Sequence, residues 1–179
     1  MRIRPVEIGD AARTAELLNA IIATGAETSM SEPLSLDEQK AYIEGFPPRG
    51  VFLVAEDAVA DRIIGMQSIE PCGDVDGENA HVAEISTFID AKCRGAGVGT
   101  ALMRALVEKA AVHGIHKLLA YIRADNAPAI GFYERSGFRR VGVLERQLRY
   151  RGRWLDQVVY ERWLGHGEGE GGGNERSTR

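Results

Sequence analysis

The sequence has few cysteines, no excess of positive charge and no long apolar run, and each absence narrows the class of protein. Its two cysteines, Cys72 and Cys93, form neither a CxxC pair nor a disulfide framework, which favours a reduced, cytoplasmic setting. The formal net charge of −4 disfavours nucleic acid or an anionic membrane as the main partner. No apolar run reaches membrane-spanning length, and the first residues show no signal-peptide pattern.

Metal and thiol chemistry are also poorly represented. His81, His113, His116 and His166 do not have the spacing of metal ligands, so no metal is expected. Cys93 has no recognisable histidine or asparagine partner and is interpreted as a bystander. What remains is a chain of 179 residues with 44% apolar content, which describes one soluble globular domain.

Apolar periodicity and turn residues predict a mixed α/β fold with one central sheet and helices on both faces. The expected strands are 2–6, 51–55, 63–69, 82–89, 118–122, 141–149 and 154–162, and the expected helices are 10–24, 35–46, 99–113 and 125–136. Together they make a single domain over residues 1–164. Residues 165–179 offer nothing apolar to bury, so a disordered, glycine-rich tail is expected there.

The chain is organised around residues 82–109, which read as a strand, a glycine loop and a helix. The loop is Arg94-Gly95-Ala96-Gly97-Val98-Gly99. This order directs free backbone N–H groups and the positive end of a helix dipole at one volume, and therefore predicts a phosphate or pyrophosphate site. The loop is not a dinucleotide-binding GxGxxG, because Leu102 replaces the last glycine, and it is not a Walker loop. A turn required only by chain geometry remains the alternative.

Two motifs resemble the GNAT acyltransferase superfamily. The Arg-x-x-Gly-x-Gly spacing after a strand is similar to its acetyl-CoA pyrophosphate loop, and Asn126-x-x-Ala129-x-x-Phe132-Tyr133-x-x-x-Gly137-Phe138 is similar to its later helix. The resemblance implies that acetyl-CoA is the co-substrate and that the Tyr133 hydroxyl lies near its sulfur. The alternative for Tyr133 is an aromatic packed on the sheet with its hydroxyl satisfied elsewhere. The implied cofactor-binding residues are Phe88, Ile89, Arg94, Gly95, Ala96, Gly97, Val98, Gly99, Thr100, Asn126, Ala129 and Tyr133.

Three further segments resemble phosphinothricin acetyltransferases and related amino-acid N-acetyltransferases. They are Ala83-Glu84-x-Ser86, Glu27-Thr28-Ser29 and Gly152-x-Trp154-x-Asp156. The resemblance implies that Glu84 is the general base and that Glu27, Thr28 and Ser29 contact the acceptor substrate. The chemistry agrees, since an alkyl ammonium with a pKa of about 10 must lose a proton before attack, and a carboxylate on an apolar strand has a raised pKa. The alternative is a glutamate at a solvated strand end.

The chain departs from this subgroup at two places. Tyr133 stands where those enzymes often have histidine, and residues 70–78 are acidic, with no cation for a substrate carboxylate. An amino-acid-like acceptor and a cationic amine therefore both stay open. The resemblance implies direct acetyl transfer to a small primary amine, with Glu84 as base and Tyr133 as acid. A non-catalytic acyl-CoA sensor and a protein N-terminal acetyltransferase are the alternatives, and the oligomeric state, a homodimer included, is open.

Overall fold

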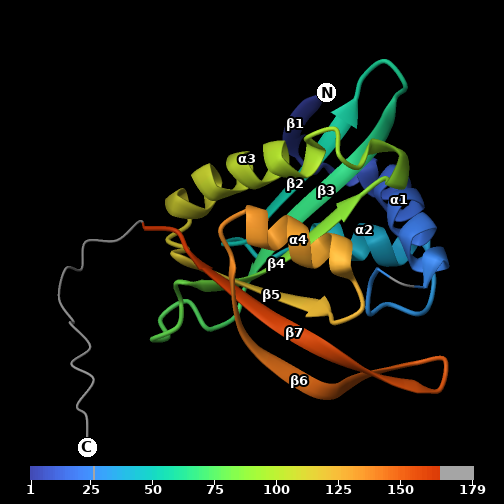
Figure 1. Cartoon of the computed structure of the whole chain (residues 1–179). Helices are drawn as coiled ribbons and strands as arrows, with labels where there is room; N and C mark the ends of the chain where they lie inside the picture. The colour runs from blue at the N-terminus through green and yellow to red at the C-terminus, as the bar shows by residue number, and fades with distance from the viewer. Residues whose placement is uncertain (26, 166–179) are drawn as a thin grey trace, which may run out of the picture.

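The computed structural model describes residues 1–25 and 27–165 (Figure 1). In these residues seven strands form one sheet in the order β1-β2-β3-β4-β5-β7-β6. Neighbouring strands are antiparallel, apart from the parallel pair β4 and β5. The strands are β1 Arg2–Pro5, β2 Val51–Asp57, β3 Arg62–Pro71, β4 Val82–Ile89, β5 Lys117–Arg123, β6 Arg139–Tyr150 and β7 Arg153–Trp163. The predicted mixed α/β architecture is confirmed.

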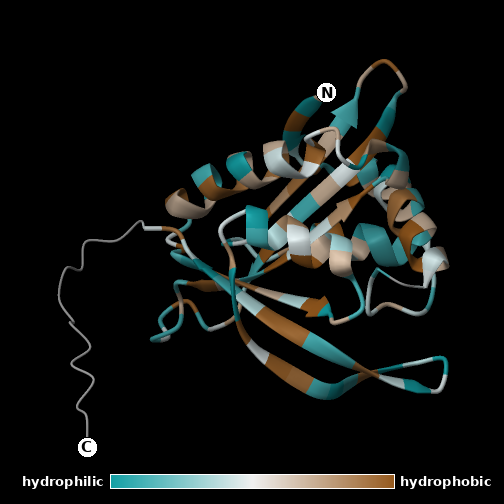
Figure 2. Ribbon diagram, in the orientation of Figure 1, coloured by the Kyte–Doolittle hydropathy of each residue, from teal (hydrophilic) through white to brown (hydrophobic). Residues whose placement is uncertain are grey.

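Four α-helices cover the two faces of the sheet and give it two apolar layers. The helices are α1 Ala11–Thr24, α2 Leu36–Glu44, α3 Val98–Val112 and α4 Ala127–Arg135. Because side chains alternate along a strand, Phe52 and Val54 of β2 pack with α1 on one face, whereas Leu53 between them packs with α3 on the other. Figure 2 shows hydrophobic colouring along the central strands and hydrophilic colouring at the tip of the β6–β7 hairpin.

Local sequence explains most helix ends. Gly25 ends α1 with a φ of 69°, and Ser35 and Glu38, which have the sequence spacing of a capping box, form one at the start of α2. α2 ends at Glu44 with Gly45 as its C-cap, earlier than predicted and ahead of Pro47. Several strands extend past their predicted ends, since cross-strand hydrogen bonds continue into polar segments that hydropathy does not mark. No helix in the described ranges has both the length and the apolar character needed to cross a membrane.

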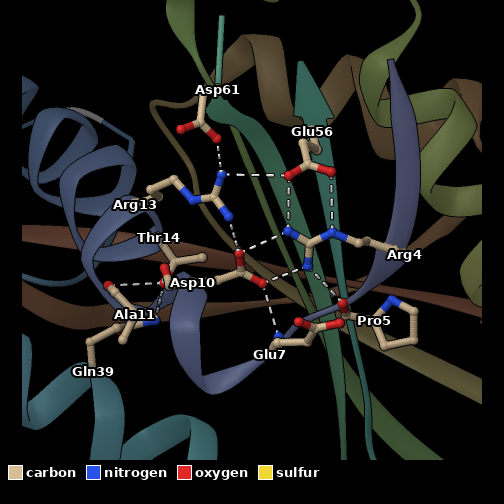
Figure 3. A network of polar contacts seen from close by, with 10 residues as sticks. All are labelled: Arg4, Pro5, Glu7, Asp10, Ala11, Arg13, Thr14, Gln39, Glu56 and Asp61. Carbon is tan, nitrogen blue, oxygen red and sulfur yellow. Dashed lines mark hydrogen bonds and ion pairs between the residues drawn. The ribbon is translucent and has the colours of Figure 1, made fainter. Parts of the chain in front are cut away.

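Asp10 occupies the N-cap position of α1, but its side chain does not cap that helix. Its carboxylate accepts from Arg4 Nη1 at 2.6 Å, from Arg13 Nη2 at 2.7 Å and from the Glu7 backbone N–H at 2.9 Å (Figure 3). Arg4 also binds Glu56 of β2, so the network joins β1, α1 and β2. The Arg4 guanidinium lowers the pKa of the Asp10 carboxyl to about 2, against the opposing effect of burial.

Asp10→Asn should therefore lower the free energy of unfolding by about 3 kcal/mol, because it removes one of the two carboxylates, with Glu56, that pair with the largely buried Arg4 guanidinium. Urea denaturation at pH 7 would measure it. Since the pKa of Asp10 is depressed in the fold, its contribution is present above pH 3.8 and is lost as the pH falls toward 2.

Asp61→Asn is the matched control for this network. It removes another carboxylate bound to Arg13, but that side chain is 90% exposed, compared with 2% for Asp10. A change below about 1 kcal/mol is expected for an exposed pair. Equal losses from the two variants would contradict the buried-pair interpretation.

The sheet opens between its two parallel strands. β4 pairs with β5 only at Val82, Ala83 and Glu84, whereas β5 continues to pair with β7 as far as Arg123. The rest of β4, up to Ile89, diverges from β5, and α4 follows directly after β5 in the chain (Figure 1). The edge of β4 is consequently free for another extended group to lie against.

Candidate active site

Two cavities meet where the sheet opens. The larger, of about 820 Å³, lies between the start of α3, the end of β4 and α4, and the smaller, of about 120 Å³, lies between β4, β5 and the segment after α1. Six residues line both of them. They are Glu27, Thr87, Phe88, Asn126, Ala129 and Tyr133. A molecule in one cavity would therefore contact the same side chains as a molecule in the other.

The glycine loop forms one wall of the larger cavity. Gly95 and Gly97 have φ values of 75° and 81°, in the left-handed region that favours glycine. A Cβ at either position would meet no heavy atom of the described chain within 4 Å, so the loop faces open space. Gly97 is the N-cap of α3, and none of the described side chains caps this helix. The first N–H groups of α3, from Val98 to Thr100, lack intrahelical partners by helix geometry and are available to an anion.

Gly99 also has a role in packing. A Cβ there would lie 2.9 Å from Cε2 of Phe132, so this glycine permits α3 and α4 to pack closely. Val98 is buried in the apolar core and anchors the first turn of α3. The loop is thus exposed around Gly97 and becomes tightly packed at the next residue.

Arg94 is already engaged by a carboxylate. Its guanidinium forms a two-pronged ion pair with Glu27, with Nη1 lying 2.9 Å from Oε1 and Nη2 contacting Oε2. Glu27 follows α1, and both residues of this pair line the larger cavity. Of the residues expected to contact the acceptor, Thr28 and Ser29 line the smaller cavity alone, while Glu27 lines both. An anion bound to Arg94 would have to share it with Glu27 or displace Glu27.

Asn126 holds the start of α4 and the segment after α1 together. Its Oδ1 accepts from the Ala129 backbone N–H at 3.2 Å, as expected for an N-cap, and its Nδ2 donates to the Glu27 carbonyl at 3.2 Å. Asn126 and Ala129 lie at the junction of the two cavities.

Tyr133 projects from α4 to the same junction and is only 5% exposed. Its hydroxyl lies 3.0 Å from Oγ1 of Thr87 on β4, and its ring packs edge-on against Phe132 and Phe138. Burial raises the pKa of Tyr133 to about 12, Thr87 opposes this rise, and the Glu84 carboxylate adds to it. The phenol is therefore protonated at neutral pH and able to donate.

Glu84 reaches the smaller cavity from the opposite face of β4. It lies directly across from Glu70 of β3 in the antiparallel register. Glu84 is exposed to solvent over part of its side chain. Its partial burial first, and then the Glu70 carboxylate, raise the pKa of Glu84 above its ordinary value. Glu70 in turn accepts from the Tyr42 hydroxyl at 2.5 Å. A carboxylate with a raised pKa at a cavity wall is suited to accept a proton from an amine.

Comparison with known proteins agrees with this geometry. The model of the family described as "Acetyltransferase (GNAT) family" matches residues 17–138, which is more than half of the chain. The chain belongs to the GNAT acetyltransferase family. This GNAT membership confirms the resemblance drawn from the paired motifs and the predicted acyltransferase class.

Individual relatives of this GNAT protein span nearly its whole fold. An L-methionine sulfoximine/L-methionine sulfone acetyltransferase from Pseudomonas paraeruginosa is 30% identical over 86% of this chain and 89% of its own length. A ribosomal-protein-alanine N-acetyltransferase from Brucella melitensis is 26% identical, with a TM-score of 0.81 over 91% of this chain and 99% of that one. A phosphinothricin acetyltransferase from Sinorhizobium meliloti, solved with acetyl-CoA, shares the fold at a TM-score of 0.83 with 23% identity, over 93% of this chain and 90% of that one.

The structure adds two groups of site residues that the sequence did not single out in this GNAT protein. Arg123, buried at the end of β5, donates to the carbonyls of Gly25 and Thr28 and pairs with Asp125, so it holds the segment after α1 to the sheet. Gln67 and Thr87 form a hydrogen-bonded chain to Tyr133. An arginine closing an apolar strand is a weak sign in the sequence, and the Gln67–Thr87 pair has no sign at all, because it depends on strand register.

Proposed function

We propose that this protein transfers the acetyl group of acetyl-CoA directly to the primary amine of a small molecule. The observation that carries the proposal is the meeting of the two cavities at Tyr133, with Glu84 on the wall of the smaller one. A volume of about 820 Å³ falls within the range of roughly 300 to 1,000 Å³ typical of ligand cavities. The residues present fit the co-substrate, since the exposed glycine loop and uncapped α3 suit a pyrophosphate and the free edge of β4 suits an extended amide chain.

The proposed binding roles follow from position. Arg94, Gly95, Ala96 and Gly97, with the backbone N–H groups of Val98, Gly99 and Thr100, surround the pyrophosphate. Phe88 and Ile89 of β4 pair with the pantetheine arm, and Asn126 and Ala129 contact it from α4. Glu27, Thr28 and Ser29 contact the acceptor. No group of three or more His, Cys, Asp or Glu side chains in the described ranges could hold a metal ion, and the proposed chemistry requires none.

The proposed reaction needs three proton movements. Glu84 takes a proton from the ammonium, directly or through water, and the neutral nitrogen attacks the acetyl carbonyl carbon and becomes positively charged. As the carbon–sulfur bond breaks, the departing sulfur receives the proton of Tyr133, and the nitrogen loses its second proton through water to the tyrosinate, which restores the phenol and leaves a neutral amide. A coenzyme thiol has a pKa of about 8.5, well below that of Tyr133, so the transfer to sulfur is uphill until the tyrosinate is reprotonated. Holding both substrates at one junction supplies much of the acceleration.

Two classes of acceptor have specific support. The relative named as an L-methionine sulfoximine acetyltransferase supports an amino-acid-like acceptor. The charges of the smaller cavity support a cationic amine, because Glu84 lines it while its arginine, Arg123, is taken up by Asp125 and two carbonyls. We propose that the protein acts in the cytoplasm, over residues 1–164 as one domain. Of the predicted tail, residues 166–179 lie outside the part of the chain that the structure describes.

An acetyl-CoA-dependent thiol-release assay over a panel of amines tests the proposal. The panel contains L-methionine sulfoximine, other amino acids, diamines and a peptide with a free N-terminal alanine. Saturable release with any small amine supports the proposal, and the preferred one assigns the acceptor class. Release with the peptide alone would favour a protein N-terminal acetyltransferase, and binding of acetyl-CoA without release would favour a sensor. Sedimentation of the same preparation would test for a homodimer.

Gly97→Glu should weaken coenzyme A binding at least about tenfold relative to Gly97→Gln, which corresponds to about 1.4 kcal/mol. Both variants carry the same backbone strain, because Gly97 has a φ of 81°, and they differ only in the charge placed where a pyrophosphate would lie. Calorimetric titration of the two folded variants measures the difference. Equal affinities would exclude this loop as the pyrophosphate site.

A further inference from the structure

A buried chain of hydrogen bonds leads from β3 through β4 to the candidate acid. Gln67 and Thr87 are directly opposite each other in the antiparallel register, and Gln67 Nε2 donates to Thr87 Oγ1 at 2.8 Å. Thr87 Oγ1 then lies 3.0 Å from the Tyr133 hydroxyl. Gln67 is 0% exposed, so bulk water does not reach the Gln67 end of this series of hydrogen bonds. Three elements thus fix the position of one phenolic oxygen.

We propose that Thr87, fixed by Gln67, is a positioning residue that donates to the Tyr133 oxygen, directs the phenolic proton into the cleft and stabilises the phenolate formed when that proton leaves. This inference rests on the proposed role of Tyr133 as acid. It extends that role to two residues that do not themselves touch the reacting atoms.

The number of protons and lone pairs on Thr87 supports the proposed direction of these hydrogen bonds, from Gln67 through Thr87 to Tyr133. A threonine hydroxyl has one proton and two lone pairs. Gln67 Nε2 donates to Thr87 Oγ1, and the Tyr133 oxygen is the one acceptor within reach of the threonine proton among the described residues, so we assign that proton to Tyr133. The phenolic proton then makes no hydrogen bond to Thr87 and can point toward the cavity that Tyr133 lines. Aligned donors also polarise one another, which strengthens the last bond when charge develops on the phenol.

Charge supports the same assignment. Burial raises the pKa of Tyr133, and the hydrogen bond from Thr87 is the effect that lowers it. Tyr133 is far less acidic than a coenzyme thiol, so transfer of its proton to sulfur is unfavourable. A hydrogen-bond donor that stabilises the phenolate makes this transfer easier.

A second glutamine–threonine pair elsewhere in the fold shows what is particular to this one. Gln39 Nε2 donates to Thr14 Oγ1 at 3.1 Å, but the Thr14 hydroxyl is bonded to the backbone carbonyl of Asp10 at 2.9 Å (Figure 3). There the series of hydrogen bonds ends on the backbone at the N-cap of α1, and its role is structural. In both pairs the glutamine Oε1 is buried without a partner among the described residues. Only the Gln67 pair ends on a titratable group at a cavity.

The test is a cycle of Thr87 variants in wild-type and Tyr133→Phe backgrounds. Thr87→Val preserves shape and removes the hydroxyl, so kcat should fall about tenfold or more while the KM for acetyl-CoA stays within about twofold. Thr87→Ser keeps a hydroxyl and should recover most of the activity. Thr87→Val should have little further effect in the Tyr133→Phe background. Thr14→Val is the matched control and should leave the kcat of folded protein unchanged.

Gln67→Met is the second variant, and it guards against a loss caused by misfolding. It removes both the donor and the unpartnered Oε1, so the melting temperature should not fall, while kcat should fall severalfold. The proposal is overturned if Thr87→Val matches wild type although Tyr133→Phe is impaired, and in that case the acid role of Tyr133 stands. Equal losses from Thr87→Val in both backgrounds would also overturn it. Wild-type turnover by Tyr133→Phe would overturn the acid role and this inference with it.

Discussion

Tyr133→Phe should lower kcat by about 10²- to 10⁴-fold while coenzyme A affinity stays within a fewfold of wild type. A positioned general acid is typically worth that much in rate, and the substitution removes only the hydroxyl. The ring that packs between Phe132 and Phe138 remains, so folding should survive. Steady-state kinetics with the best amine from the panel, together with calorimetric titration of coenzyme A, measure both quantities.

The size of this loss, rather than a change in pH profile, identifies the acid. Because the pKa of Tyr133 is raised to about 12, its deprotonation causes no loss of activity at ordinary alkaline pH. Tyr160→Phe is the matched control, since Tyr160 is equally buried but bonds to Glu134 away from both cavities. It should keep wild-type kcat. Turnover by Tyr133→Phe equal to that of the control would show that water protonates the thiolate instead.

Glu84→Gln should lower kcat/KM by about 10²- to 10⁴-fold near pH 7, with the deficit shrinking as the pH approaches 10. The free amine then replaces the lost base, because an alkyl ammonium loses its own proton near pH 10. In the wild type, activity should fall on acidification as Glu84 becomes protonated. Its raised pKa places that fall above the ordinary value of 4.5. A pH–rate profile of both proteins decides the matter.

Glu70→Gln tests how much the Glu70 carboxylate contributes to the raised pKa of Glu84. Burial and the Glu70 carboxylate together raise the pKa of Glu84, so removing the second charge should move the acidic limb to lower pH and leave the plateau in place. An unchanged profile in Glu84→Gln would make Glu84 structural. An unchanged limb in Glu70→Gln alone would mean that burial accounts for the raised pKa.

The sequence predicted the elements whose signals are local. The β4 strand, the glycine loop and the start of α3 follow one another within residues 82–109, so periodicity and glycine spacing were sufficient to place them. The capping box at Ser35 is equally local, since it joins residues three apart. These short-range patterns also carried the family resemblance, which is why the fold was predictable.

Contacts between distant segments were not predictable in this way. Arg94 and Glu27 are 67 residues apart, and both were expected to face ligands, yet they form an ion pair. Gln67 and Thr87 meet only because β3 and β4 pair in one particular register. Asp10 is a residue type that often caps helices, but its carboxylate binds Arg4 and Arg13 instead of the first turn of α1. In each case a charge or hydrogen bond from another element overrides the local preference.

The sharing of wall residues between the two cavities limits how this enzyme could be redesigned. A substitution at Phe88 or Ala129 would alter both sites, so a variant selected for a new acceptor there would also change its response to the acyl donor. Ser86, Tyr121 and Gln157 line the smaller cavity alone. Directed evolution toward new amines should therefore begin at these three positions, where acceptor preference can drift while donor binding is preserved.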